Sequence, residues 1–210
     1  GRPNCEVGCD CDRFLEVWNL VFTQYNKEAD GSYKPLERKN IDTGAGLERL
    51  AMVLQGVNNL FEIDTVRPLL DHFAAKAGIS YGKGGQNDVS LRVITEHLRG
   101  ITFMVADGIM PSNEGRGYVL RRILRRAVRH GKLLQLEGSF LSDAVSLVVE
   151  LMGDAYPEIA EKYDYIVRIV GLEEERFKET LDQGMEILTK HIVSLTAEGK
   201  NSLTGEVAFK

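Results

Sequence analysis

The sequence predicts an α+β fold, in which a small antiparallel sheet is followed by a mostly α-helical domain. Three observations support this prediction. Residues 14–43 are rich in strand formers, the apolar spacing becomes helical from Leu47 onward, and Gly44 and Gly46 separate the two patterns. We place the boundary near residues 58–64 and expect one domain in residues 1–60 and a second in residues 61–210.

The first expected element is a strand in residues 14–26, a segment rich in Val, Phe, Trp and Tyr. Asn19 and Val21 fall on one face of this strand, because side chains alternate along a strand. Both faces carry large apolar groups, so we expect a central strand. Turn-forming residues at positions 28–32 then lead into an antiparallel partner in residues 33–43.

The remaining elements are expected to be helices. An amphipathic helix begins at Leu47 and ends at Gly56, because its apolar residues recur at intervals of three and four. A loop in residues 81–86 is expected to be flexible from its glycine content. Further helices are predicted at about residues 64–77, 87–107, 113–130 and 139–152, and a long one follows Pro157 and continues with few breaks to about residue 194.

The composition excludes several classes of protein. The 210 residues include 26 basic and 31 acidic side chains and are 43% hydrophobic, which excludes a disordered tail, a collagen-like chain and a disulfide scaffold. No apolar run approaches the roughly 20 residues of a membrane span, and no secretory signal opens the chain. We therefore expect a soluble, cytoplasmic protein with no membrane partner. Because the chain begins at Gly1 and ends within a pattern at Lys210, we expect it to be an excerpt from a longer protein.

Three cysteines, Cys5, Cys9 and Cys11, lie within seven residues. Their odd number argues against disulfides and suits a reducing compartment. A closed zinc site needs four ligands, and no further His or Cys lies nearby in the sequence. We favour reduced thiols in a loop and predict no metal site, although a distant histidine could complete one.

The charge is unevenly distributed. Residues 116–132 contain six arginines, one lysine and no acid, so this segment carries +7, and the rest of the chain carries −12 to give the net charge of −5. Its arginines fall on one arc of a helix and its apolar residues on the opposite arc. Two explanations remain open: a surface that binds a polyanion through bidentate arginine contacts, or an internal network with the acids at positions 173–175.

Two further segments can contact a ligand. Ser112 or Asn113 is a natural N-cap for the arginine-rich helix, and a helix N-terminus beside an Asn amide suits a phosphate or a base edge, although a simple capped turn remains the alternative. Asp42 and Arg49 flank two glycines and could hold a substrate that bears an ammonium and a phosphate. Alternatively, Arg49 pairs with a neighbouring carboxylate, and the glycines only form a turn.

Long segments of the chain resemble one family. The run IDTGAGLERLAMVLQG, residues 41–56, resembles motif 3 of class II aminoacyl-tRNA synthetases in the form that alanyl-tRNA synthetases use. Residues 12–26, 99–131 and 204–210 resemble the same family in the same order. The resemblance covers nearly the whole chain and implies a class II catalytic-core remnant followed by a helical domain that recognises the tRNA acceptor stem.

The resemblance implies a role for each matching residue. Asp42 would hold the amino group of alanine, Gly44 would shape the pocket for its small side chain, and Asn19 and Val21 would line that pocket. Arg49 would bind the γ-phosphate of ATP, with Gly46 beside the nucleotide. Asn113 would contact the G3·U70 pair of alanine tRNA. The other implied tRNA contacts are the arginines of the following helix, Arg116, Arg121, Arg122, Arg125, Arg126 and Arg129.

The implied activity is that of an alanine–tRNA ligase, which uses ATP with Mg²⁺, alanine and alanine tRNA. In the family, motifs 1 and 2 lie upstream of the matched segments, and the zinc-containing editing domain and the oligomerisation region lie downstream. We therefore expect these 210 residues to be inactive alone. The alternative is a non-enzymatic module that binds the acceptor stem.

Overall fold

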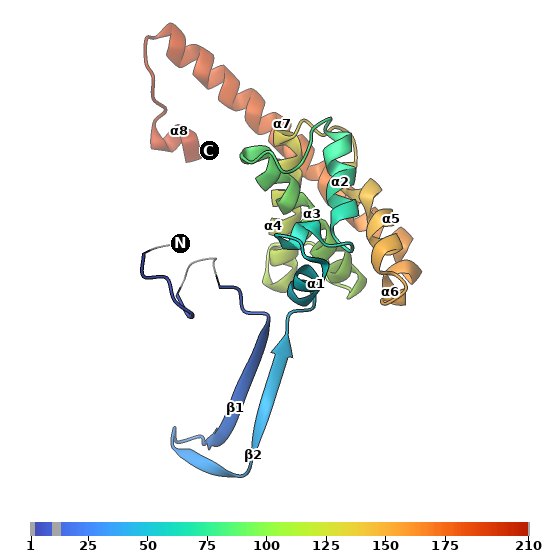
Figure 1. The fold of residues 1–210 in the computed structure, drawn as a ribbon. Coiled ribbons are helices and arrows are strands. Elements are labelled where there is room, and N and C mark those ends of the chain that lie inside the picture. Colours follow the sequence, from blue (N-terminus) through green and yellow to red (C-terminus); the bar gives the residue numbers. More distant parts are fainter. Residues whose placement is uncertain (1–2, 10–13, 210) are drawn as a thin grey trace. The chain divides into compact units, whose positions relative to one another are not determined.

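The computed structural model describes residues 3–9 and 14–209, which divide into a hairpin unit that ends at Val66 and a helical unit that begins at Arg67 (Figure 1). The hairpin unit contains strands β1 (Trp18–Lys27) and β2 (Tyr33–Ala45), helix α1 (Leu47–Gln55) and a 3-10 turn, η1 (Leu60–Glu62). The helical unit contains α2 (Arg67–Lys76), α3 (Gln86–Ala106), α4 (Gly115–Leu133), α5 (Phe140–Met152), α6 (Pro157–Glu161), α7 (Tyr163–Ala197) and α8 (Gly205–Phe209). The α+β prediction is confirmed.

Strands β1 and β2 form an antiparallel hairpin, as the sequence predicts. Its turn is closed by Asp30, whose carboxylate accepts hydrogen bonds from the backbone N–H of Ser32 at 2.9 Å and from its hydroxyl at 2.6 Å. Gly31 takes a φ of 85°, a conformation that glycine adopts without steric cost. Strand β1 begins four residues later than expected.

The expectation that β1 is a central, covered strand is wrong for the described part of the chain. The sheet there has two strands, which leave both of its faces open. Phe22 and Leu20 are therefore 64% and 60% exposed, although their residue types suit a sheet interior. A two-stranded hairpin buries too little apolar area to be stable without further packing.

Helix α1 begins and ends at glycines, as predicted. Gly46 is its N-cap residue, and Gly56 ends it with a φ of 65° in the left-handed region. The N–H of Val57 then donates to the carbonyl of Met52 at 3.2 Å, which satisfies one of the last carbonyls of the helix. The capping glycine therefore explains why the apolar pattern stops here.

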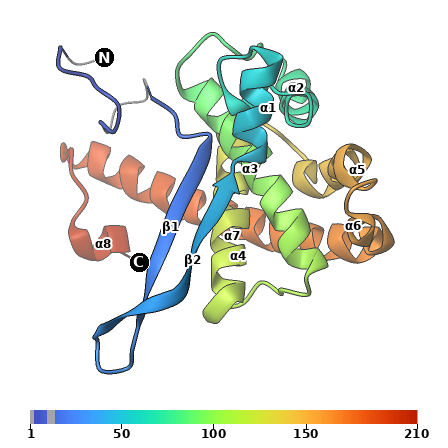
Figure 2. The ribbon, with the colours of Figure 1, turned by 60° about the horizontal axis from the view of Figure 1, so that its bottom comes forward.

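The helical unit packs α3 against α4 and places α7 across α4 and α5 (Figure 2). Among the residues whose burial is described, its core is aliphatic except for Phe73 and Phe140, whose rings meet edge to face at 6.3 Å. Gly131 lies under the second ring: a Cβ at this position would come within 2.1 Å of the Phe140 ring. Any larger residue at position 131 would therefore separate α4 from the start of α5.

The long helical stretch predicted after Pro157, with few breaks, is divided in the structure into α6 and α7 at Lys162. The backbone of Lys162 leaves the α-helical region, and its ammonium donates to the carbonyl of Ala106 at the end of α3, at 2.6 Å. A tertiary hydrogen bond thus accompanies a break that the local sequence does not signal.

Beyond the bundle, α7 continues as an exposed helix. Residues 182–194 are all exposed, and they include Met185, Ile187, Ile192 and Val193.

No helix of the described residues is long and apolar enough to cross a membrane.

The loop in residues 81–86, predicted to be flexible from its composition, is held by side chains of α3. The buried carboxylate of Asp88 accepts hydrogen bonds from the N–H groups of Gly82 at 3.1 Å and Gly84 at 2.7 Å. Arg92 donates to the hydroxyl of Tyr81 at 2.8 Å. The glycines therefore provide positive φ angles for a loop that the start of α3 binds.

Glu174 of α7 caps α5 from another helix. Its fully buried carboxylate accepts hydrogen bonds from the N–H groups of Leu141 and Ser142, each at 3.2 Å, whereas the N-cap residue Ser139 makes no side-chain cap. Lys178 lies 3.8 Å away. Burial raises the pKa of Glu174, and the two N–H donors and Lys178 oppose that shift.

We predict that Glu174→Ala lowers the free energy of unfolding by about 2 kcal/mol, because two N–H groups at the start of α5 lose their acceptor. Glu174→Gln keeps an acceptor oxygen and should be tolerated. Because the folded-state pKa of Glu174 is raised, its ionisation costs stability as pH rises above the unfolded value of 4.5. The stability of Glu174→Gln relative to the unsubstituted chain should therefore increase from pH 4 to pH 7 in urea titrations. A pH-independent difference would contradict this account.

Candidate substrate face and nucleic-acid interface

Four of the predicted substrate residues lie on one face of the hairpin. In the strand register, Asn19 is opposite Gly44 and Val21 is opposite Asp42. Directly opposed residues share a face, and so do residues two apart along a strand, so these two pairs are adjacent neighbours. The sequence pattern alone placed Asn19 and Val21 on one face, and the strand register adds Asp42 and Gly44 to that face.

The space on this face is open at Gly44. A Cβ at that position would meet nothing within 4 Å, so the absence of a side chain leaves room between Asn19 and Asp42 rather than relieving a clash. A carboxylate beside such a gap can hold an ammonium group, and the gap admits a small substituent.

Arg49, the predicted phosphate ligand, is anchored to the segment before β1. Its Nη1 donates to the carbonyl of Glu16 at 2.7 Å, and a Cβ at Gly46 would lie 3.1 Å from its Cδ. A guanidinium has five N–H donors, so Arg49 can hold this carbonyl and an anion together.

Glu16 is a site residue that the sequence pattern did not single out. Its carbonyl holds Arg49, and its carboxylate accepts a hydrogen bond from the amide of Asn19 at 3.4 Å. The contact with Arg49 depends on how α1 folds back after β2, 33 residues along the chain, and no local spacing signals it.

In the helical unit, the loop before α4 is packed against the first turn of that helix. A Cβ on Gly117 would lie 2.2 Å from the carbonyl of Met110 and 2.3 Å from the hydroxyl of Ser112. The expected N-cap, Ser112 or Asn113, is wrong: Glu114 is the N-cap residue, and the hydroxyl of Ser112 donates to the Glu114 carbonyl at 2.8 Å. Ser112 therefore shapes the loop that presents Asn113.

The arginine-rich helix is not one uniform cationic face. Arg121 and Arg125 turn toward α7, where the side chain of Glu173 is only 5% exposed. Their Nε atoms lie 3.1 and 2.9 Å from the same carboxylate oxygen, and Arg125 also covers the ring of Phe177 at 5.0 Å. Of the two explanations that the sequence left open, these two arginines therefore follow the internal ion-pair network with the acids of α7.

The other arginines of α4 point outward. Arg122, Arg126 and Arg129 are exposed and recur at intervals of four and three residues, so they form one stripe along the helix. Arg122 lies 5.6 Å from the centroid of the Tyr118 ring, and Arg116 is exposed in the first turn. This arrangement of cations with an exposed aromatic ring suits a polyanion.

Two histidines lie beneath this stripe. Nδ1 of the buried His130 lies 3.0 Å from the hydroxyl of Ser90, and Nε2 of His97 lies 3.3 Å from Nη1 of Arg126. Burial lowers the pKa of His130, and Arg126, Arg129 and His97 lower it further. His130 therefore adds no positive charge to the stripe at neutral pH.

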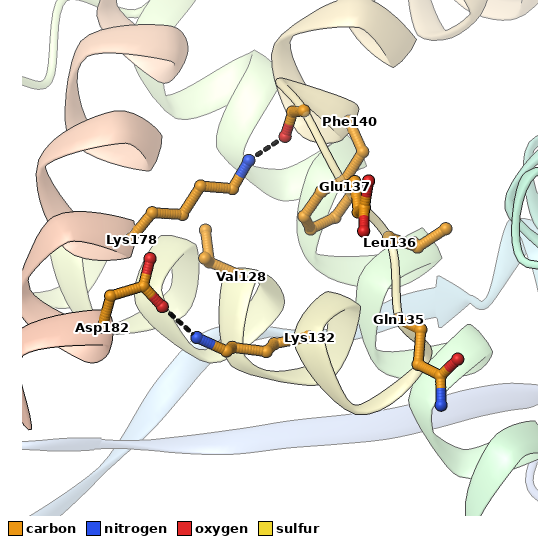
Figure 3. Close-up of a pocket in the computed structure, with 9 residues that line it drawn as sticks. Val128, Lys132, Gln135, Leu136, Glu137, Phe140, Lys178 and Asp182 are labelled. Carbon is orange, nitrogen blue, oxygen red and sulfur yellow. Dashed lines mark hydrogen bonds and ion pairs between the residues drawn. The ribbon is translucent and has the colours of Figure 1, made fainter. Parts of the chain in front are cut away.

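A cleft of about 430 Å³ in the helical unit lies between the end of α4, the start of α5 and α7 (Figure 3). Val128, Leu136 and Phe140 form its apolar wall. Its two lysines already have partners: Lys132 contacts Asp182, and Lys178 contacts the Gly138 carbonyl. None of the sequence-predicted site residues lines this cleft.

The cysteine segment is partly described. The sulfur atoms of Cys5 and Cys9 lie 3.2 Å apart, whereas Cys11 lies outside the described residues. Within residues 3–9 and 14–209, no group of three His, Cys, Asp or Glu side chains is arranged to hold a metal ion.

The chain matches the model of a protein family described as tRNA synthetases class II (A), over residues 2–210. The chain belongs to this family. The match confirms the resemblance of the sequence motifs to class II synthetases, and it extends through both the hairpin unit and the helical unit.

Similar proteins in this family are named alanine–tRNA ligases. The chain is 60% identical over 210 residues to that of Thermoanaerobacter sp. and 57% identical over 210 residues to that of Acetivibrio thermocellus, each match covering all of this chain. It is 57% identical over 208 residues to that of Natranaerobius thermophilus, which covers 99% of this chain. The chain spans 24% of the length of these relatives.

We predict that Gly117→Ala lowers the free energy of unfolding by about 1–3 kcal/mol, because the new methyl group displaces the loop that presents Asn113. Gly100→Ala is the matched control, since Gly100 lies within α3 and a Cβ there meets nothing within 4 Å. That control should stabilise the chain by about 0.5–1 kcal/mol through helix propensity. Urea unfolding measures both, and equal effects of the two substitutions would contradict the packing described for Gly117.

Proposed function

We propose that this chain is part of an alanine–tRNA ligase, with the hairpin unit in the amino-acid site and the helical unit on the tRNA acceptor stem. The observation that carries the proposal is the register that pairs Asn19 with Gly44 and Val21 with Asp42 on one face. The names of the relatives support the same assignment. The reaction belongs in the cytoplasm, where tRNA is charged for translation.

In this proposal, alanine binds over the gap at Gly44. The carboxylate of Asp42 receives the ammonium group, because a charge-assisted hydrogen bond is the strongest contact that such a small ligand can make. Asn19 and Val21 flank the gap and limit the size of the side chain that enters. The selected substrate is therefore an amino acid with a small side chain.

ATP, bound with Mg²⁺, is the second substrate. Arg49 meets the γ-phosphate, with Gly46 beside the nucleotide. A carboxylate oxygen of alanine attacks the α-phosphorus, the bond to the β-phosphate breaks, and pyrophosphate leaves with alanyl adenylate formed. The 3′-terminal hydroxyl of the tRNA then attacks the alanyl carbonyl and releases AMP. Positioning and charge stabilisation supply the catalysis. The zinc of the family belongs to the editing domain, outside this chain.

The helical unit binds the acceptor stem through the exposed stripe of α4. Arg116, Arg122, Arg126 and Arg129 contact backbone phosphates, and Asn113 contacts the G3·U70 pair. Arg121 and Arg125 were also predicted to contact tRNA, and their contacts with Glu173 favour an indirect part in binding.

We predict that Asp42→Asn, in the full-length ligase that carries this chain, lowers kcat/KM for alanine roughly 10- to 100-fold in alanine-dependent pyrophosphate exchange. The reason is the loss of a charged hydrogen-bond partner for the ammonium group. Glu37→Gln, an exposed carboxylate of the same strand, is the control and should change nothing. Unchanged alanine use by Asp42→Asn would refute the assignment of Asp42.

We also predict that Arg122→Glu combined with Arg126→Glu weakens binding of an acceptor-stem minihelix and flattens the salt dependence of the affinity, because two phosphate contacts are lost. The control pair, Lys190→Glu with Lys200→Glu, changes the net charge equally but lies near the end of α7, where each lysine contacts a glutamate. Filter binding from 50 to 200 mM salt measures both variants.

The same titration decides between the ligase and the alternative of a non-enzymatic binding module. Preference for a G3·U70 minihelix over a G3·C70 minihelix supports tRNA selection by the helical unit. Equal affinity for the two minihelices, combined with a steep fall in affinity as salt rises, supports electrostatic binding alone.

A further inference from the structure

Glu173 is a buried carboxylate that joins α7 to the loop carrying Asn113. It is 4% exposed, and one of its oxygens faces the Nε atoms of Arg121 at 3.1 Å and Arg125 at 2.9 Å. Arg125 donates a hydrogen bond to it, and Arg121 forms an ion pair with it. A carboxylate this deeply buried needs such partners, because ionised groups are costly to remove from water.

Arg121 extends the connection from Glu173 to the loop. Its Nη1 donates to the side-chain oxygen of Asn113, and its Nη2 donates to the carbonyl of Pro111 at 3.4 Å. The Nε of Arg121 is paired with Glu173 by charge and proximity and makes no hydrogen bond, so the carboxylate fixes the position of the guanidinium, and the bonds from its two Nη atoms to the loop fix its plane. The orientation of the Asn113 amide therefore depends on the ion pair between Glu173 and Arg121.

The surroundings make this connection specific to one carboxylate. The side chain of Arg121 is only 17% exposed, and the small pocket beside it is lined by Met110 and Pro111 of the loop together with Ile169, Leu172 and Arg176 of α7. The next residue, Glu174, caps α5 instead, and Glu175 is exposed. Among these three consecutive glutamates, Glu173 alone pairs with Arg121 in the described structure.

We propose that Glu173 is a positioning residue for recognition of the acceptor stem: it orients Arg121, which in turn orients the amide of Asn113 for the wobble pair. The inference rests on the proposed function, in which Asn113 meets that pair. In this proposal Arg121 and Arg125 hold the loop that carries Asn113, and the exposed arginines of α4 contact the phosphates.

The test compares Glu173→Gln with the matched control Glu175→Gln in the complete 210-residue chain. The side-chain amide signals of Asn113, assigned by their loss in Asn113→Asp, should shift in Glu173→Gln and not in the control. The preference for a G3·U70 over a G3·C70 minihelix should fall about tenfold. Affinity for the G3·C70 minihelix should be unchanged or higher, because a negative charge has been removed.

A second variant separates positioning from simple stability. Arg121→Lys keeps the positive charge but lacks the fork that spans Glu173 and Asn113, so it should lose the same preference. Helical circular dichroism and the melting temperature are recorded for each variant. Equal loss of affinity for both minihelices together with a lower melting temperature would assign Glu173 a structural part only and overturn the proposal.

The outcomes also separate this proposal from the proposed function. If the unsubstituted chain binds both minihelices equally, the assignment of Asn113 to the wobble pair fails. In that case, a shift of the Asn113 amide in Glu173→Gln still supports the connection through Arg121. If the Asn113 signals do not move in Glu173→Gln, the positioning proposal is wrong whatever the RNA data show.

Discussion

The helical unit depends on the burial of two consecutive carboxylates of α7. Successive residues of a helix point about 100° apart, so Glu173 and Glu174 meet different neighbours. Glu173 receives two arginines of α4, and Glu174 receives the N–H groups that open α5. A buried charge without partners would cost several kcal/mol, so α4, α5 and α7 must keep the arrangement that satisfies both carboxylates. The same constraint connects the packing of the unit to the loop that carries Asn113.

In the hairpin unit, the equivalent constraint is the register between β1 and β2. A shift of one residue would send every side chain of one strand to the other face, so the pairs Asn19–Gly44 and Val21–Asp42 exist only in this register. Gly44 leaves open space on that face, and Arg49 donates to the carbonyl of Glu16, just before β1. A small gap, one carboxylate and one anchored arginine are thus arranged by backbone pairing and one tertiary hydrogen bond.

Much of this structure could be predicted from the sequence where the signal is local. The hairpin, helix α1 with its stop at Gly56, and the approximate ranges of α2 to α5 follow from periodicity and glycine positions. The features that local signals did not place depend on tertiary contacts. The helix break at Lys162 coincides with a hydrogen bond to Ala106, 56 residues away. The expected N-cap, Ser112 or Asn113, is replaced by Glu114, because the loop packs closely against Gly117 of α4, which has no side chain. The resemblance to class II synthetases came from long motifs, and the family match confirms it.

The sequence by itself determined the α+β class, the concentration of positive charge on one helix and the family, because composition, period and motif are properties of the chain order. Only the tertiary structure decided how the arginines of α4 are used. Periodicity places Arg121, Arg122, Arg125, Arg126 and Arg129 on one arc, but two of them face the buried Glu173 and three remain exposed. The reason is that a helix has one pattern of side-chain directions, whereas the neighbour met along each direction depends on how α7 packs against it.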